Sequence, residues 1–142
     1  MLEFEYDALN RLVRKLSGGA AIVSYQYDDL AKANCVGRLS KVTDQSGSTE
    51  FFYDRLGREI KSGKAVDAVA YTVERTYDIL DRLATLKYPD GEVVTYAYDA
   101  NSGALEKVQG AAVYVQNINY NAKGQIKALQ YGNNVQTTYT YG

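Results

Sequence analysis

The sequence has no histidine and no tryptophan, and its 142 residues include one cysteine and one proline. Without histidine, the chain has neither the commonest general base nor the commonest metal ligand. The lone Cys35 excludes an intrachain disulfide, so stability has to come from packing and backbone ladders. We therefore expect no catalytic residue, no metal site and no cofactor.

Charge and hydropathy exclude two further classes of protein, namely nucleic-acid-binding proteins and membrane-spanning proteins. The chain has 16 basic and 17 acidic residues, spread along its length, for a net charge of −1. Binding to nucleic acid requires a positive field, and no basic cluster is present. No apolar run approaches the roughly eighteen residues of a membrane span. The N-terminal residues 1–5 lack a basic region followed by an apolar run, so we expect no signal peptide in this chain.

Tyrosine is the residue in excess, with fourteen copies against three phenylalanines, and twelve glycines are scattered along the chain. This composition is typical of an all-β protein with frequent hairpins.

The tyrosines also form a repeat, because Tyr-Asp recurs and then continues as Tyr-Asn and Tyr-Gly at intervals of 21, 26, 24, 21, 22 and 21 residues. The copies are Tyr6-Asp7, Tyr27-Asp28, Tyr53-Asp54, Tyr77-Asp78, Tyr98-Asp99, Tyr120-Asn121 and Tyr141-Gly142.

A second landmark follows five residues after the tyrosine. It is an arginine or glutamine that comes after glycine, asparagine or aspartate, with an apolar residue next to it (Leu12, Leu83 and Ile126) or one residue later (Ile60). Its copies are Asn10-Arg11, Gly57-Arg58, Asp81-Arg82 and Gly124-Gln125. Gly103-Ala104-Leu105 fits with one added residue, and Gly37-Arg38-Leu39 fits with six. The unit is therefore Tyr-Asp-x-x-Gly-Arg-Leu followed by a variable stretch.

The segment between the landmarks has the chemistry of a turn. In residues 54–57, Asp54 can accept a hydrogen bond from a nearby backbone N–H, and Gly57 can adopt a positive φ. This combination predicts a type I turn followed by a bulge residue, which is a common hairpin connection. Asn10 and Asp81 take the glycine position, and both residue types tolerate the left-handed region. The recurring aspartates are accordingly interpreted as turn formers and not as catalytic acids.

The strand before each turn places aromatic residues at i and i+2, as in Tyr25/Tyr27 and Tyr96/Tyr98. Such pairs share one face of a strand and predict an aromatic ladder along the sheet. The returning strands instead show i, i+3 apolar pairs such as Leu39/Val42 and Leu105/Val108. Either both faces are partly apolar or a bulge shifts the phase, and the sequence leaves both alternatives open.

These patterns predict an all-β fold of consecutive antiparallel β-hairpins that form a curved open strip. We expect a single domain over residues 1–142 with about six hairpin repeats. Residues 62–70 are expected to form an extended loop, and residues 29–35 a loop rather than a helical turn. The repeat residues expected to build the structure are Tyr6, Asp7, Tyr27, Asp28, Tyr53, Asp54, Gly57, Arg58, Tyr77, Asp78, Arg82, Tyr98, Asp99, Tyr120 and Gly124.

The segments 53–58 and 77–82 resemble the repeat unit of the Rhs/YD-repeat proteins, which include bacterial Rhs proteins, Tc toxin shell subunits and teneurins. Residues 27–29, 37–39, 44–49 and 131–134 are also similar to this family, so the resemblance covers essentially the whole chain. It implies a segment of a spiral shell that, in a secreted or cell-surface parent protein, encloses a C-terminal toxin. The implied partners are the remaining repeats and that toxin, and the implied role is structural and not enzymatic.

Two other interpretations concern surfaces. The unpaired edges of an open strip predict self-association. Exposed tyrosines outside the repeat position, Tyr71, Tyr88 and Tyr114, are candidates for contact with carbohydrate. The alternative function is therefore a carbohydrate- or cell-surface-binding module. The repeating arginines are expected to cover aromatic surface or to pair with turn carboxylates.

Overall fold

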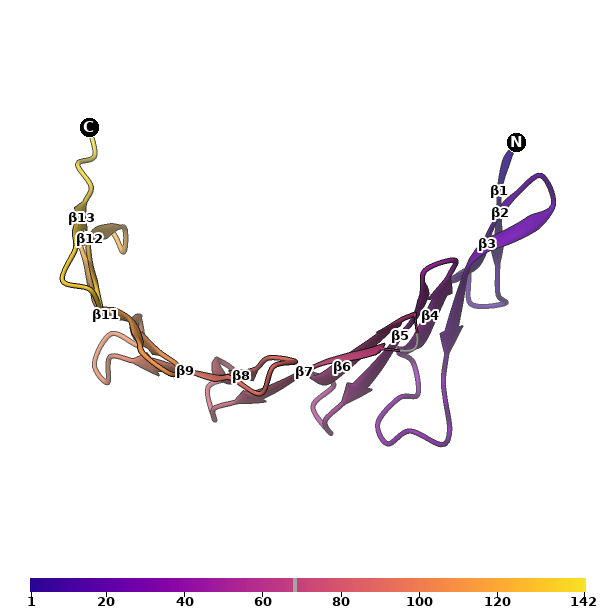
Figure 1. Cartoon of the computed structure of the whole chain (residues 1–142), viewed down its shortest axis with the longest axis horizontal. Helices are drawn as coiled ribbons and strands as arrows, with labels where there is room; N and C mark the ends of the chain where they lie inside the picture. Colours follow the sequence, from indigo (N-terminus) through magenta and orange to yellow (C-terminus); the bar gives the residue numbers. More distant parts are fainter. Residues whose placement is uncertain (68) are drawn as a thin grey trace. The chain divides into compact units, whose positions relative to one another are not determined.

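The structure, a computed structural model, describes residues 1–67 and 69–142. The described residues form strands and turns, with thirteen strands arranged in one open sheet in sequence order (Figure 1). The prediction of an all-β fold built from consecutive antiparallel hairpins is confirmed. The strands are β1 (Leu2–Tyr6), β2 (Leu12–Ser17), β3 (Ala20–Tyr27), β4 (Leu39–Asp44), β5 (Gly47–Tyr53), β6 (Glu59–Val66), β7 (Val69–Tyr77), β8 (Leu83–Lys87), β9 (Val93–Tyr98), β10 (Leu105–Gln109), β11 (Val113–Tyr120), β12 (Ile126–Tyr131) and β13 (Gln136–Thr138).

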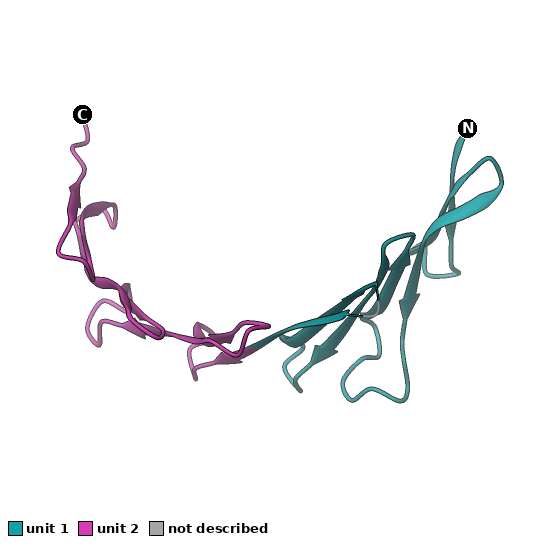
Figure 2. Cartoon of the chain, viewed as in Figure 1, with its two compact units in different colours: residues 1–74 teal, residues 75–142 magenta. Residues whose placement is uncertain are grey.

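The chain divides into two compact units, residues 1–74 and residues 75–142, and the boundary falls within β7 (Figure 2). Unit 1 contains β1 to β6 and most of β7, and unit 2 contains the end of β7 and β8 to β13. The expectation of a single domain stays a prediction, and each unit is described by itself below.

The registers show how the apolar residues share one face. In unit 1, Tyr25 lies opposite Val42 and Tyr27 lies opposite Leu39. In unit 2, Tyr96 lies opposite Val108 and Tyr98 opposite Leu105. Because directly opposed residues point to the same face of a sheet, the i, i+3 apolar residues of a returning strand face the i, i+2 aromatic residues of the preceding strand. The apolar face therefore continues across both strands of the hairpins β3–β4, β9–β10 and β11–β12. In the hairpin β5–β6, by contrast, Phe51 lies opposite Ser62 and Tyr53 opposite Glu59.

A bulge lies beside the Tyr-Asp or Tyr-Asn turn of five hairpins and shifts the register there. The register shifts between Gln26 and Tyr27, so Gln26 pairs with Lys41 while Tyr27 pairs with Leu39, and Ser40 is left as the extra residue. The same shift occurs at the ends of β1, β5 and β11, and between Leu105 and Lys107 on β10. One extra residue reverses the face of everything beyond it. Of the two alternatives for the i, i+3 pairs, the bulge is therefore the correct one.

The prediction of an extended loop over residues 62–70 was wrong. β6 continues to Val66 and β7 starts at Val69, with Ser62 opposite Val73 and Ala65 opposite Ala70. Ala68 lies outside the described residues. The small and polar composition of residues 62–65 indicated a loop, but the backbone of this segment pairs with strands on both sides. A single-layer sheet leaves a face in solvent, so a strand there does not need apolar side chains.

The sheet is not covered by a second layer among the described residues, and few side chains are buried. The buried ones are Cys35, Ser40, Val94, Ile118 and Ala128. Most globular domains bury one face of a sheet against another element, so this fold has to use other contacts to hold its hairpins in register. In the described part of the chain, no helix with the length and hydropathy of a membrane-crossing segment occurs.

Candidate functional site: a clasp between successive hairpins

Each Tyr-Asp landmark marks the turn of a hairpin. At residues 54–58, the Asp54 N–H donates to the Arg58 carbonyl at 3.0 Å and the Gly57 N–H donates to the Asp54 carbonyl at 3.0 Å. Gly57 has a φ of +83°, and Asn10 and Asp81 occupy the same place with φ of +59° and +65°. A hydrogen bond from i+3 to i followed by a left-handed residue is the predicted type I turn with its bulge residue. This part of the sequence analysis is confirmed.

The aspartate side chain binds both the turn and the arginine that follows it. Oδ1 of Asp54 accepts from the N–H of Leu56 at 2.9 Å and from the N–H of Arg58 at 3.0 Å, while Oδ2 accepts from Nε of Arg58 at 2.7 Å. The turns at Asp7 and Asp78 repeat all three bonds within 0.1 Å. One carboxylate thus satisfies two backbone donors and forms a charge-assisted bond.

A neutral copy of the same turn occurs at residues 121–125. Oδ1 of Asn121 accepts from the N–H of Lys123 at 2.9 Å and from the N–H of Gln125 at 3.0 Å. Nδ2 of Asn121 then donates to Oε1 of Gln125 at 2.8 Å. The replacement of Asp by Asn and of Arg by Gln therefore keeps the geometry of the turn and removes its charges.

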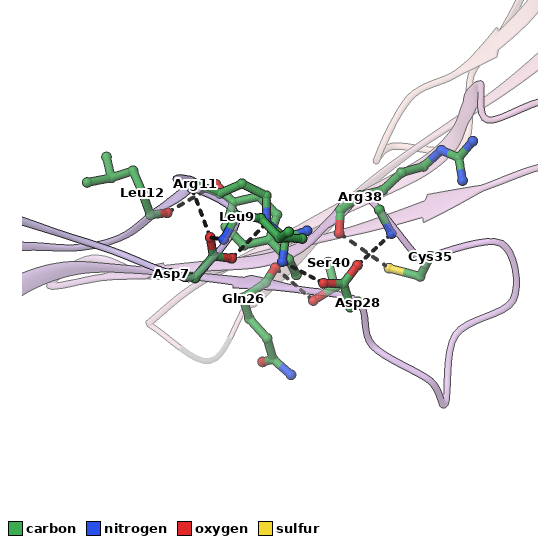
Figure 3. A network of polar contacts seen from close by, with 11 residues as sticks. Asp7, Leu9, Arg11, Leu12, Gln26, Asp28, Cys35, Arg38 and Ser40 are labelled. Carbon is green, nitrogen blue, oxygen red and sulfur yellow. Dashed lines mark hydrogen bonds and ion pairs between the residues drawn. The ribbon is translucent and has the colours of Figure 1, made fainter.

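The arginine of one repeat also contacts the next repeat. Figure 3 shows Arg11 between two aspartates, with Nε donating to Asp7 at 2.7 Å and Nη2 donating to Asp28 at 2.6 Å. The same guanidinium lies 4.4 Å from the ring centroid of Tyr27, within the range of a cation–π contact. Arg82 does the same in unit 2: it lies 4.1 Å from the ring centroid of Tyr98 and donates to the Gly103 carbonyl at 3.0 Å.

The repeat tyrosine completes the contact through its hydroxyl. Tyr98 donates to the Leu83 carbonyl at 2.8 Å, so it bonds to the returning strand of the preceding hairpin. Four other repeat tyrosines make the equivalent bond at 2.7 to 3.1 Å. These bonds are Tyr27 to Leu12, Tyr53 to Leu39, Tyr120 to Leu105 and Tyr141 to Ile126. We call the set of turn aspartate, its arginine and the next tyrosine the inter-repeat clasp.

The ion pairs of the clasp favour the charged carboxylates. Hydrogen bonds from Arg82, first from its N–H and then from its side chain, hold the pKa of Asp78 below the ordinary value against the opposing effect of partial burial. The Arg11 side chain, aided by the Gly37 N–H, likewise lowers the pKa of Asp28. In return, hydrogen bonds with Asp28 and then Asp7 raise the pKa of the Arg11 guanidinium. These carboxylates and the Arg11 guanidinium are therefore charged at neutral pH.

The six-residue insertion in the second repeat folds back onto the sheet. Nζ of Lys32 donates to the Ser40 carbonyl at 3.1 Å, lies 3.2 Å from a carboxylate oxygen of Glu50, and sits 4.6 Å from the ring centroid of Phe52. Ser40, the bulge residue, is buried and donates to the Gln26 carbonyl, and the neighbouring Cys35 is also buried. The insertion therefore forms a loop, as expected, that covers the bulge beside it.

The structure thus brings the predicted repeat residues together within each unit, and it shows what sequence reasoning missed. Arginine was expected to cover an aromatic ring or to pair with a carboxylate, and Arg11 and Arg82 do both at once. The hydroxyl bond to the preceding repeat was not anticipated. A signal was present, because the landmark is tyrosine in all seven copies whereas the position two residues earlier varies, as in Phe51 and Ile118.

The three tyrosines proposed for carbohydrate contact are distributed over both units. Tyr71 lies on β7 in unit 1, while Tyr88 and Tyr114 lie in unit 2, and all three are partly exposed. The Tyr114 hydroxyl donates to Glu92, which also accepts from the N–H of Ala111 at 3.0 Å. This bond, with the nearby carboxylates, raises the pKa of Tyr114.

The contacts of this site hold successive hairpins together. Among the described residues no group of three or more His, Cys, Asp or Glu side chains is placed to hold a metal ion. What recurs is a set of short polar bonds and cation–π contacts that join one hairpin to the next.

Comparison with solved structures shows where this fold occurs. The chain superposes on a chain of the TcdB2-TccC3-Cdc42 crystal structure with a TM-score of 0.76 and 20% identity, covering 99% of this chain and 8% of that one. A chain of the Tc holotoxin pore of Photorhabdus luminescens matches with the same values. A chain of the TcdB2-TccC3-TEV crystal structure gives a TM-score of 0.67 and 18% identity over 99% of this chain and 10% of that one. No protein-family model and no curated protein sequence matches the chain.

These similarities establish the fold, which is shared with chains found in Tc toxin complexes. The chain spans a tenth or less of the length of each structure that it matches.

Proposed function

We propose that the chain is a structural, non-catalytic wall segment of an Rhs-type YD-repeat shell in a secreted or cell-surface parent protein. The inter-repeat clasp carries this proposal. Five repeat tyrosines bond through their hydroxyls to the preceding hairpin, and Arg11 and Arg82 each contact two successive repeats. Such nearest-neighbour contacts build a sheet of any length without a second layer, which is what a thin wall requires.

The role of such a wall is to separate a polypeptide from proteases and from the producing cell. The fold similarity to chains of TcdB2-TccC3 complexes supports this role, because it covers 99% of the chain. The proposed partners are further repeats on either side and a C-terminal toxin polypeptide inside the shell. The many tyrosines serve the wall itself in this proposal.

Limited proteolysis of the complete polypeptide encoded by the parent gene tests the proposal. We expect a C-terminal segment to resist trypsin in the native parent and to be digested when it is expressed alone or when the parent is opened with urea. Equal digestion of the segment in the native parent and in isolation, or a parent with no polypeptide following its repeats, would contradict the role.

The carbohydrate-binding alternative has its own test. It requires saturable binding in a glycan titration that is lost in Tyr88→Ala or Tyr114→Ala and kept in Tyr25→Phe. We favour the wall because it explains the periodic contacts, whereas carbohydrate binding explains only the exposure of three tyrosines.

A further inference from the structure

The fifth repeat does not have the arginine that the clasp uses elsewhere. Ala104 stands at the place that Arg11 takes in the first repeat and Arg82 in the fourth. The tyrosine of the following repeat is nevertheless in position, because the Tyr120 hydroxyl donates to the Leu105 carbonyl at 2.9 Å. The fifth and sixth repeats are therefore joined by the usual hydroxyl bond, but their own sequence places no guanidinium between them.

A pocket of about 360 Å³ occurs at this place, within unit 2. Ala104 lines it, and so do the residues that correspond to the three groups that the Arg11 guanidinium contacts in the first clasp. These residues are Asp99 for Asp7, Tyr120 for Tyr27 and Asn121 for Asp28. The pocket therefore lies where a clasp arginine would lie, and its volume is within the range of small-ligand sites, roughly 300–1,000 Å³.

The pocket keeps the carboxylate of the clasp. Oδ1 of Asp99 accepts from the N–H and the hydroxyl of Ser102, both at 2.7 Å, and from the N–H of Asn101 at 3.2 Å. Oδ2, the atom that binds arginine Nε at Asp7 and Asp78, has no donor among the described residues. The bonds from Ser102, first from its hydroxyl and then from its N–H, lower the pKa of Asp99, so its carboxylate is charged at neutral pH.

Two further groups of the pocket attract a cation. Glu106 lines it, is exposed and forms no ion pair with any residue that the structure describes. The half-buried ring of Tyr120 has no described arginine or lysine over its face, unlike the rings that Arg11 and Arg82 cover. Asn121 is neutral, so Glu106 supplies the second negative charge that an aspartate supplies in the first clasp.

An arginine side chain suits these groups better than other cations do. Guanidinium is planar and has five N–H donors, so it can stack on an aromatic ring and donate in its own plane to a carboxylate. Arg82 makes this pair of contacts one repeat earlier, 4.1 Å from the Tyr98 ring centroid and with Nη2 2.7 Å from Asp78. A lysine ammonium is a compact and strongly hydrated point charge, and it gains less from such a pocket.

We propose that the pocket between the fifth and sixth repeats binds the guanidinium group of an arginine side chain from a second polypeptide. The guanidinium donates to Oδ2 of Asp99, covers the ring of Tyr120 and lies beside Glu106. It completes from outside a clasp that Arg11 and Arg82 complete from within. The proposal depends on the contents of this pocket and not on the shell function proposed above.

Titrations of the nitrogen-15-labelled full chain, followed by amide chemical shifts, test the proposal. The probe is the peptide acetyl-Gly-Arg-Gly-amide, and the matched probes carry lysine, or citrulline as the uncharged analogue, in place of arginine. We expect saturable shifts at Ser102, Ala104 and Asn121 with the arginine peptide. The dissociation constant should be at least tenfold higher for the lysine peptide, and the citrulline peptide should not saturate. Agmatine, a guanidine without a peptide, should bind as well.

Variants place the contact in the pocket. Ala104→Arg supplies the arginine from within, so it should abolish binding of the arginine peptide and raise the urea midpoint of unfolding. The matched control is Ala112→Arg, which adds the same charge at an exposed position of unit 2 outside the pocket and should leave binding unchanged. Asp99→Asn should raise the dissociation constant at least tenfold, and the turn at Asn121 shows that asparagine supports this kind of turn. Far-UV circular dichroism checks that each variant keeps its fold.

Three results would overturn the proposal. The first is a titration in which the arginine peptide causes no saturable shift, and binding of agmatine alone would then show a site for free guanidines only. The second is equal binding of the arginine and lysine peptides, which would show a general cation site. The third is unchanged binding in Ala104→Arg, which would place the contact outside the pocket. None of these results bears on protection of a polypeptide in the parent protein.

Discussion

Removing one tyrosine hydroxyl should measure the strength of the inter-repeat clasp. In Tyr98→Phe the ring stays beneath Arg82, whose guanidinium lies 4.1 Å from its centroid, and only the 2.8 Å bond to the Leu83 carbonyl is lost. A hydrogen bond of this kind contributes about 0.5–1.5 kcal/mol net. We therefore expect the free energy of unfolding to fall by about 1 kcal/mol. With a urea m-value of about 2 kcal/mol/M, the midpoint should decrease by about 0.5 M.

The same strand provides the control. Tyr96 lies two residues earlier, and burial raises its pKa, but its hydroxyl has no hydrogen-bond partner among the described residues. Tyr96→Phe should therefore change the urea midpoint, followed by far-UV circular dichroism, much less than Tyr98→Phe does. Equal effects of the two substitutions, or no effect of Tyr98→Phe, would show that the hydroxyl does not hold the repeats together.

Three further predictions address the turn, the ion pairs and the insertion. Gly57→Ala should destabilise the chain by about 1–2 kcal/mol in the same urea assay, because its φ of +83° disfavours a Cβ. Gly124→Asn, at a φ of +76°, should destabilise the chain much less, since asparagine tolerates this region. The pKa of Asp78 is lowered in the folded chain. The contribution of Asp78 to stability is therefore complete above the ordinary aspartate pKa near 4, and it is lost as the pH falls through the lowered folded value. Hydrogen exchange at decreasing pH should show that this turn opens before the neutral turn at Asn121. The buried thiol of Cys35 should react with a thiol reagent only as fast as the insertion opens, and rapid reaction in the native chain would contradict its packing.

The turns could be predicted because their chemistry is local. Asp54 and Gly57 lie three residues apart, so their hydrogen bond and positive φ follow from residue types alone. The bulge remained one of two alternatives because it depends on pairing between strands. The i, i+3 spacing of Leu39 and Val42 carried the signal, and only the register of β3 against β4 decided it.

The contacts between repeats could not be predicted because they join residues about fifteen positions apart. The Tyr98 hydroxyl on β9 bonds to the Leu83 carbonyl on the neighbouring strand β8, and neither residue type identifies the other as its partner. The preference for tyrosine over phenylalanine at the landmark is the one feature that could have indicated a hydroxyl bond. The loop prediction for residues 62–65 failed for a different reason. Their small and polar composition indicates a loop, but they belong to a strand that pairs with neighbouring strands on both sides.

Nuclear Overhauser spectroscopy of the full chain would test the clasp most directly. The structure requires contacts from the ring protons of Tyr98 to the side chain of Arg82 in the preceding repeat, and from Tyr98 to Leu105 across its own hairpin. We predict both sets in one spectrum, together with a slowly exchanging Tyr98 hydroxyl proton. A spectrum with the contacts to Leu105 and none to Arg82 would show hairpins that form singly and are not clasped to one another, which would contradict the account.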